Sequence, residues 1–433
     1  MIVLSFLTLI LFSATLLNLP AASADGKSIG FIDALFTATS AVCVTGLVVV
    51  DTLTHWTLFG QLVILFAIQL GGLGIITFAT FFSVMLGRKV SMKGRRLAQE
   101  SLNDYTYDGV LTLIKNVVLI TFYIEFIGSL FFMTRFVPEY GSKGVYMGIF
   151  HAVSSFCNAG FDLTGNFTSL TGYTDDPVVI YTTALLVIIG GLGFMVWRDI
   201  YEHPRLQGLY LHTKVVLIMT GSLITAGALY FMLSEYNNPL TLGGLDFIEK
   251  INAAVFQSVT CRTAGFNTIS TGDMNEVSQI ATVVLMFIGA APGSTAGGIK
   301  VTTAGVILMA IISNIRGSED TIILQRKVSH SVVNKALSIA GLSLALIFII
   351  TTIIIGIEKT DFVSVLFEVT SAFGTVGLST GITAGLHPIS KILLIFTMFL
   401  GRVGPVTFAI ALAMKAQREN RRTVYPEGKI VVG

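Results

Sequence analysis

The sequence contains few charged residues and lacks the residue patterns of catalysis. Only 12% of its 433 residues are charged, about half the fraction typical of soluble domains. Three cysteines and six scattered histidines form no HExxH pair, Ser/His/Asp set or Cys/His cluster. No Walker A motif or strand–glycine loop–helix unit indicates nucleotide binding. We therefore predict that the protein is not an enzyme, and that it carries no cofactor and binds no nucleic acid.

Apolar residues are abundant instead. They make up 53% of the chain, and the mean hydropathy is +0.80. Eight apolar runs are each long enough to cross a bilayer, which takes about 20 residues. The first run lacks a basic n-region, which favours a retained span over a cleaved signal peptide ending near Ala24. The runs are 1–19, 58–86, 110–134, 177–197, 213–233, 277–312, 336–357 and 389–414.

Charge is distributed unevenly between the segments that join these runs. Eight spans place both termini on one side, and that side holds 17 of the 27 Lys and Arg residues, against seven on the other. The basic side is the cytoplasmic one, so we predict a multi-pass protein of the plasma membrane with both termini in the cytoplasm. The outer side is acidic, which would concentrate cations at a pore mouth; ordinary solvation of loops explains it equally well.

Four stretches between the runs end in a small-residue turn that closes on glycine. The glycines are separated by 114, 105 and 112 residues. Each stretch opens with a helix too short to cross, such as Ile32–Val42 or Phe362–Phe373, as re-entrant segments do. Non-helical backbone is tolerated at membrane depth only where it is buried in protein or lines a water-filled cavity. The stretches are Phe36–Leu47, Phe150–Phe161, Phe256–Phe266 and Phe367–Leu378.

This periodicity predicts an all-α integral membrane protein built from four covalently linked helix–re-entrant pore loop–helix repeats around one central pore. Tight turns between ordinary helical hairpins are the alternative. The predicted divisions are repeat 1 at 1–86, repeat 2 at 110–197, repeat 3 at 212–314 with a broken second span, repeat 4 at 334–416 and a cytoplasmic tail at 417–433.

Rings of backbone carbonyls can replace the hydration shell of a monovalent cation. Glycine tolerates φ > 0, so it lets successive carbonyls turn toward one axis, and no loop tip carries the acidic ring expected for divalent ions. The third copy is one residue shorter and places Arg262 beside the ring. The cysteines are packing residues or, less simply, soft metal ligands. The predicted filter residues, which would hold potassium at their carbonyls, are Cys43, Val44, Thr45, Gly46, Cys157, Asn158, Ala159, Gly160, Arg262, Thr263, Ala264, Gly265, Gly374, Thr375, Val376 and Gly377.

The sixth apolar run is interrupted at 289–298 by residues that cannot continue a helix. It starts 24 residues after Gly265, so we predict a gate below the third loop; a structural kink is the alternative. Two cations lie near it within apolar sequence, where a charge is costly. Arg402 raises the ion barrier, ties helices together through loop carbonyls, or forms an inter-helix salt bridge without a transport role. Lys300 either acts at the gate or snorkels. Glu125 could pair with either. The gate residues are Ala290, Ala291, Pro292, Gly293, Ser294, Thr295, Ala296, Gly297, Gly298, Lys300 and Arg402.

Over essentially its whole length the chain resembles the Trk/Ktr/HKT superfamily of potassium transporters, most closely the membrane subunit of Ktr-type systems. The motifs are VCVTGL at 42–47, CNAGFDL at 157–163, TCRTAGFN at 260–267, SAFGTVGL at 371–378, GGLG at 71–74 and 190–193, IGAAPGSTAGGIK at 288–300 and GRVGP at 401–405.

The resemblance implies potassium flux, with the four glycines selecting potassium over sodium and sodium modulating some members. It implies that 289–298 is an intramembrane gating loop and that Arg402 projects into the ion path. It also implies a homodimer seated on a cytosolic ring, whose subunits, not this chain, bind ATP or ADP.

Other interpretations remain open at this stage. The basic segments 87–108, 316–327 and 418–433 would dock such a ring, or would only attract lipid headgroups. A sodium-coupled carrier for an organic solute, with broken helices at the midplane, is the main alternative function. A structural or sensory membrane protein is a third, which leaves four re-entrant loops unexplained.

Overall fold

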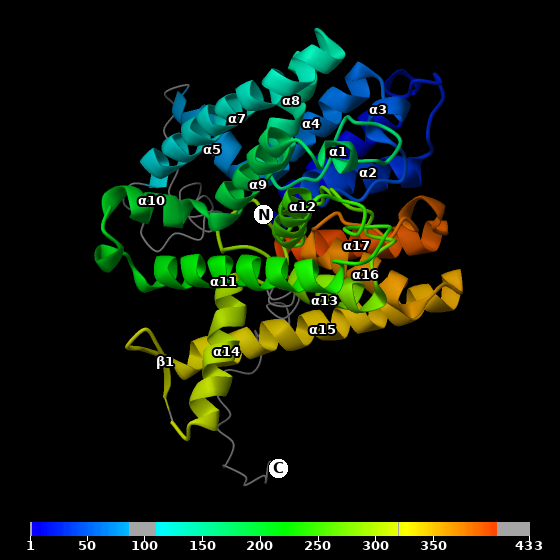
Figure 1. The fold of residues 1–433 in the computed structure, drawn as a ribbon. Helices are drawn as coiled ribbons and strands as arrows, with labels where there is room; N and C mark the ends of the chain where they lie inside the picture. The colour runs from blue at the N-terminus through cyan, green and yellow to red at the C-terminus, as the bar shows by residue number, and fades with distance from the viewer. Residues whose placement is uncertain (1, 86–109, 319, 405–433) are drawn as a thin grey trace, which may run out of the picture.

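A computed structural model describes residues 2–85, 110–318 and 320–404, and almost all of its regular structure is helical (Figure 1). The first segment contains α1 (Ile2–Leu17), η1 (Pro20–Ala22), α2 (Phe31–Cys43), α3 (Thr52–His55), α4 (Leu58–Leu73) and α5 (Ile75–Met85). Next come α7 (Val110–Tyr140), α8 (Lys143–Phe156), η2 (Thr171–Tyr173), α9 (Pro177–Leu192), α10 (Phe194–Glu202) and η3 (Leu206–Gly208).

The second half of the chain repeats this order. It contains α11 (Leu211–Ser234), α12 (Phe247–Thr260), α13 (Glu276–Phe287) and α14 (Val301–Ile315), then the antiparallel hairpin of β1 (Thr321–Ile323) and β2 (Arg326–Val328). It closes with α15 (His330–Glu358), α16 (Phe362–Gly374), η4 (Thr383–Gly385) and α17 (Pro388–Val403). In Figure 1, α14 and the hairpin lie at the edge of the molecule.

The short helices α2, α8, α12 and α16 are the four predicted from the periodic stretches; α2 and α16 agree with their predicted bounds to within one residue. Each packs against the long helix before it, in the pairs α1–α2, α7–α8, α11–α12 and α15–α16. The phenylalanine that opens each stretch is at most 1% exposed. These buried rings hold the short helices against their neighbours through close van der Waals packing.

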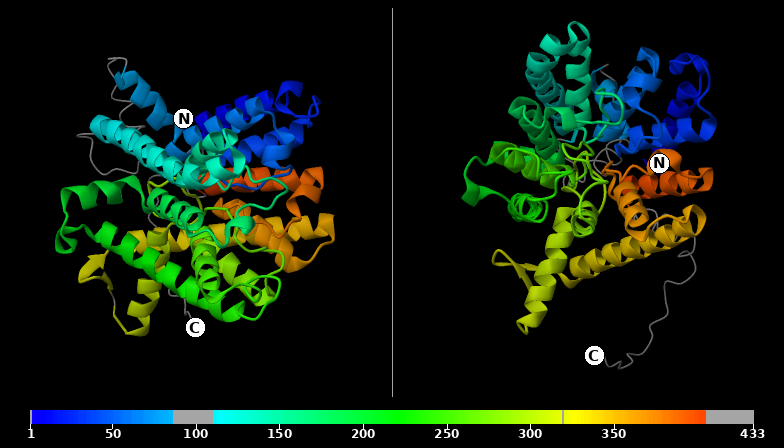
Figure 2. Two further views of the ribbon diagram at one scale, coloured as in Figure 1. Left: turned by 45° about the horizontal axis from the view of Figure 1, so that its top comes forward. Right: turned by 45° about the vertical axis from the view of Figure 1, so that its right-hand side comes forward.

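The packing between successive units closes on itself. The helix that follows each glycine contacts the short helix of the next unit, in the pairs α4–α8, α9–α12, α13–α16 and α17–α2. Figure 2 shows the result in its right-hand view, where the differently coloured segments surround a centre in which loops meet. Residues more than a hundred positions apart are thereby brought together at that centre.

The apolar runs 58–86 and 177–197 do not form single helices. Each is two helices that meet near a right angle, at 85° for α4 and α5 and 88° for α9 and α10. The bends fall on Gly74 and Gly193, whose φ values are 83° and 90°. A right-handed helix cannot continue through such dihedrals, so the last glycine of each GGLG motif ends its helix.

Fewer full-length spans are present than the eight predicted. Within the described residues, three helices (Leu111–Tyr140, Leu211–Ser234 and His330–Glu358) are long and apolar enough to cross a membrane, or up to five if each bent pair counts once. The other runs form shorter helices, with 16 residues in α1 and 12 in α13. The interruption at 289–298 is non-helical, as predicted, and separates α13 from α14. The segment 87–108, the end of the last repeat at 405–416 and the tail 417–433 lie outside the described residues.

Candidate functional site

The four closing glycines lie together in a closed ring. A Cβ atom added to Gly46 would lie 2.6 Å from the carbonyl oxygen of Ala159, the residue before the second glycine. The same relation carries on around the ring, from Gly160 to Ala264 at 2.8 Å, Gly265 to Val376 at 2.5 Å and Gly377 back to Thr45 at 2.2 Å. Each glycine thus abuts the carbonyl of the next loop in cyclic order, and no side chain fits at any of them.

The backbone of every loop has the same unusual conformation. The glycines have φ of 90°, 69°, 81° and 95°, and the residue two positions before each is also left-handed: Val44, Asn158, Thr263 and Thr375, at 58°, 59°, 69° and 50°. Non-glycine residues in this region cost of order 1–3 kcal/mol and persist where surrounding structure imposes them. Sequence reasoning assigned positive φ to the glycines alone, because valine and threonine give no local signal for it.

Hydroxyl side chains of the short helices tie each loop back to its own helix. Ser40 Oγ accepts from Gly46 N at 3.0 Å, and Ser371 Oγ accepts from Gly377 N at 3.1 Å. In the other two loops the direction reverses: Ser154 and Thr260 donate to the carbonyls of Phe161 and Phe266. Sequence reasoning missed these four residues, although a Ser or Thr five or six positions before each glycine was visible as a signal.

The third loop is one residue shorter than the others, but its glycine still lies in the ring. Arg262, predicted beside the filter, has its backbone in this loop, but its guanidinium turns away to Thr220 on α11. There Nη1 and Nη2 lie 3.5 and 3.4 Å from the carbonyl and hydroxyl oxygens of Thr220. The arginine side chain therefore braces the loop against α11 and does not reach the carbonyl ring.

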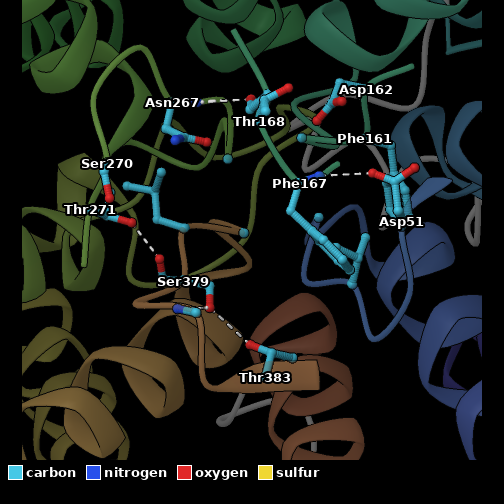
Figure 3. Close-up of a pocket in the computed structure, with 18 of the residues that line it drawn as sticks. Asp51, Phe161, Asp162, Phe167, Thr168, Asn267, Ser270, Thr271, Ser379 and Thr383 are labelled. Carbon is cyan, nitrogen blue, oxygen red and sulfur yellow. Dashed lines mark hydrogen bonds between the residues drawn. The ribbon is translucent and has the colours of Figure 1, made fainter. Parts of the chain in front are cut away.

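A cavity of about 520 Å³ opens on the ring from the side of the residues that follow each glycine. Two of its lining residues are acidic, Asp51 and Asp162 (Figure 3). Asp51 accepts from Phe167 N at 2.9 Å, which joins the first and second outer loops. Burial raises the pKa of Asp162 above its ordinary value. Both acidic side chains therefore lie next to the ring glycines in one cavity.

The segment 289–298 crosses the opposite side of the ring, next to the residues that precede the glycines. Thr295 Oγ1 donates to Asn158 Oδ1 at 3.1 Å. A Cβ atom on Gly297 would lie 2.2 Å from Thr375 Oγ1, so the segment also touches the fourth loop. Ala291 N donates to the carbonyl of Gly191, at the end of α9, at 3.0 Å. The segment thus contacts two opposite loops at once.

Lys300 and Arg402 both bind backbone carbonyls of this region. Lys300 Nζ donates to Ala296 O at 2.7 Å. Arg402 donates to Thr295 O, and also to the carbonyls of Gly71 and Gly72 at the end of α4. Carbonyls in the last turn of a helix lack intrahelical partners and favour a cation. Arg402 therefore joins α17, α4 and the segment 289–298 through carbonyls, and no carboxylate of residues 2–85, 110–318 or 320–404 forms a salt bridge with it, which argues against the salt-bridge alternative.

Glu125 is not the partner of either cation. Its Oε1 accepts from Gln69 Nε2 at 3.0 Å and lies 3.9 Å from Cys157 Sγ. Cys157 in turn lies against Gly72, where an added Cβ would be 2.7 Å from the sulfur. All three cysteines are buried and unpaired, and the described residues hold no group of three or more His, Cys, Asp and Glu arranged to hold a metal ion. Packing accounts for the positions of the cysteines.

The GGLG motifs pack closely, as their small residues suggested, but against backbone. Added Cβ atoms on Gly71 and Gly190 would lie 2.0 Å from the carbonyls of Val42 and Phe156, at the ends of α2 and α8. Gly401 makes the same approach to Phe373 at 1.9 Å. The GRVG motif is therefore the fourth unit's copy of GGLG, with Arg402 in place of the second glycine.

The chain is similar to known transport proteins along almost its whole length. The family model of TrkH, described as a cation transport protein, matches residues 2–422. Potassium uptake protein B of the Ktr system of Bacillus subtilis is 44% identical over 429 residues, which cover 99% of this chain and 95% of that protein. The Potassium/sodium uptake protein NtpJ of Enterococcus hirae is 41% identical over 433 residues, covering 99% and 95%.

A solved structure shows the same fold. The crystal structure of the potassium transporter TrkH from Vibrio parahaemolyticus matches with a TM-score of 0.74 at 19% identity, covering 96% of this chain and 86% of that one. The resemblance drawn from the motifs is confirmed, and so is the prediction that the protein is a transporter and not an enzyme. The chain belongs to the TrkH family of cation transport proteins.

Proposed function

We propose that the protein takes up potassium across the plasma membrane through a filter of backbone carbonyls. The observation that carries this proposal is the glycine ring, in which each glycine abuts the carbonyl of the next loop. Carbonyl oxygens in such a ring replace the hydration shell of a monovalent cation. The names of the relatives in Bacillus subtilis and Enterococcus hirae, which include potassium uptake, support the choice of ion.

The ring encloses one pore shared by four repeats. Its re-entrant pore helices are α2, α8, α12 and α16. Their length, their burial and the cyclic packing of the helices that follow them support this assignment. The repeats keep the divisions predicted from the sequence. The excess of Lys and Arg in the segments joining the repeats supports a cytoplasmic location for those segments and for both termini.

The segment 289–298 acts as the gate of this pore. It contacts the second and fourth loops on the inner side of the ring, so an ion leaving the filter must pass it. Arg402 and Lys300 hold the segment by its carbonyls. Opening requires the hydrogen bonds from Lys300 and Arg402 to these carbonyls to break. The two side chains therefore stabilise the closed arrangement.

Regulation comes from a second protein. The described residues offer no nucleotide-binding motif, and the relatives are named as parts of Ktr systems. We infer a homodimer docked on a cytosolic ring that binds ATP or ADP, with sodium as a modulator of flux. The basic segments 87–108, 316–327 and 418–433 are the docking face.

Uptake into proteoliposomes tests the proposal. Purified protein should accumulate rubidium, a potassium substitute, well above sodium, and nucleotide-loaded regulatory protein should change the rate. Protein-free liposomes and a rubidium-versus-sodium competition series are the controls. Absence of rubidium uptake by folded protein, or uptake of organic solutes driven by sodium, would overturn the proposal in favour of the carrier.

A further inference from the structure

One register position of the four short helices always holds a buried polar residue. It follows directly after the opening phenylalanine and is occupied by Thr37, His151, Gln257 and Glu368. Each is at most 1% exposed. Buried polar groups are nearly always hydrogen-bonded, so the partner of each side chain shows what it holds in place.

Glu368 on α16 binds the outer segment of the fourth loop. Its Oε1 accepts from Ser379 Oγ at 2.6 Å and from Thr380 N at 2.9 Å, and its Oε2 accepts from Thr383 Oγ1 at 2.7 Å. These three residues line the outer cavity; Ser379 and Thr383 are labelled in Figure 3. The Thr271 hydroxyl then donates to Ser379 O, which joins the third loop to the same wall.

His151 on α8 makes the corresponding contact in the second loop. Its Nε2 accepts from Leu163 N at 3.4 Å, and its Nδ1 lies 2.8 Å from Met147 O. Accepting at Nε2 requires a neutral ring whose proton is on Nδ1, where it is donated to Met147. Leu163 and Thr380 are both three residues after their glycines, so the two braces reach the same point of two loops.

The other two units use the position differently. Thr37 donates to Asp33 O in its own helix. Gln257 Nε2 lies 3.8 Å from the sulfurs of Cys261 and Met274. Neither shows a bond to the residue three places after its glycine among the described contacts. The braces therefore occur only in the second and fourth units, which lie opposite each other in the cyclic order of the ring.

We propose that Glu368 and His151 are positioning residues of the filter, which hold the outer ends of two opposite loops. Each fixes the backbone just beyond its glycine, so the glycine carbonyl cannot rotate independently of the short helix. Glu368 dominates because it holds three residues through both oxygens, whereas His151 holds one. The role rests on the proposed potassium filter, and it requires hydrogen-bond acceptance, not negative charge.

Two substitutions of Glu368 distinguish a requirement for hydrogen-bond acceptors from a requirement for negative charge. Glu368→Met keeps the length and removes both acceptors. Glu368→Gln keeps Oε1 for Ser379 and Thr380, and its amide can donate to the Thr383 hydroxyl. In proteoliposomes, Glu368→Met should lower the preference for rubidium over sodium about tenfold, the size expected from losing acceptors to a buried N–H. Glu368→Gln should stay within about twofold of the wild type.

His151→Phe, compared with Thr37→Val, supplies the matched test at the same register. The first should lower the preference about threefold, in keeping with a single 3.4 Å bond, and the second should leave it unchanged. Monodisperse elution and a single cooperative thermal transition confirm folding. Wild-type selectivity in folded Glu368→Met, or equal loss in Glu368→Gln and Glu368→Met, would overturn the positioning role. A wild type that does not prefer rubidium would instead overturn the proposed function.

Discussion

Replacing each ring glycine with alanine should damage selectivity in a defined order. An added Cβ would lie 2.2 Å from the facing carbonyl oxygen at Gly377, 2.5 Å at Gly265, 2.6 Å at Gly46 and 2.8 Å at Gly160. Real Cβ atoms essentially never approach closer than 3.0 Å. Subtracting the two extreme values from 3.0 Å shows that the neighbouring carbonyl must move by at least about 0.8 Å at Gly377 but only about 0.2 Å at Gly160.

The backbone dihedrals point the same way at both extremes. Gly377 has φ of 95°, outside the left-handed helical region, whereas Gly160 at 69° lies close to it. Alanine therefore meets more strain at Gly377 than at Gly160. A misplacement of about 1 Å costs on the order of a hundredfold where function depends on geometry. We expect Gly377→Ala to lower the rubidium-over-sodium preference by about that factor and Gly160→Ala by less than about tenfold.

Rubidium and sodium uptake by the four variants in proteoliposomes measures this order. Gly26→Ala is the matched control for backbone strain, because Gly26 has φ of 67° and no atom within 4 Å of an added Cβ. It should retain the wild-type preference. If Gly160→Ala loses more preference than Gly377→Ala, or if all four behave like Gly26→Ala, the carbonyls facing the glycines do not form the selective site.

Two further predictions concern the inner and outer ends of the molecule. Arg402→Met removes the donor to three carbonyls, so the rate of rubidium uptake should rise severalfold while the preference over sodium changes less than about twofold. Glu235→Gln should lower the free energy of unfolding by about 1–3 kcal/mol at neutral pH, which is seen as a lower Tm. The reason is that the buried carboxylate accepts hydrogen bonds from Asn238, Thr241 and Asn275. Burial opposes ionisation of Glu235, but these bonds outweigh it and hold its pKa below the ordinary 4.5. This contribution is therefore present above pH 4.5 and lost as the pH falls through the folded-state pKa, so the Tm difference from the wild type should shrink in acid.

Each of these predictions has a control that makes the same type of substitution elsewhere in the chain. Arg135→Met breaks an exposed outer ion pair with Asp176 and should leave the uptake rate unchanged. Glu276→Gln changes an exposed carboxylate and should lower Tm at neutral pH less than Glu235→Gln does. An unchanged rate of rubidium uptake by folded Arg402→Met would contradict the proposed role of this arginine in the gate. A Tm difference for Glu235→Gln that grows in acid would contradict the stated role of its carboxylate.

Much of the architecture could be predicted from residue order alone. The spacing of Gly46, Gly160, Gly265 and Gly377, each after a phenylalanine-led apolar stretch, predicted four short helices followed by turns. Helices α2 and α16 begin and end within one residue of that prediction. Helix length and apolar periodicity are local properties of the chain, which is why they could be read without knowing any contact. The break at 289–298 was equally local, since one proline with four glycines in ten residues disfavours a helix through the intrinsic properties of those residues.

Other features depended on contacts between distant residues and had no local signal. Val44 and Thr375 take left-handed conformations where α2 and α16 end, although neither side chain favours that conformation by itself. The turn of Arg262 toward Thr220, the carbonyl partners of Arg402 and the pairing of Glu125 with Gln69 join segments 42 to 331 positions apart. Only the closed packing of the four units decides which charge meets which backbone group, because a side chain's partner is set by distance in space and not along the chain.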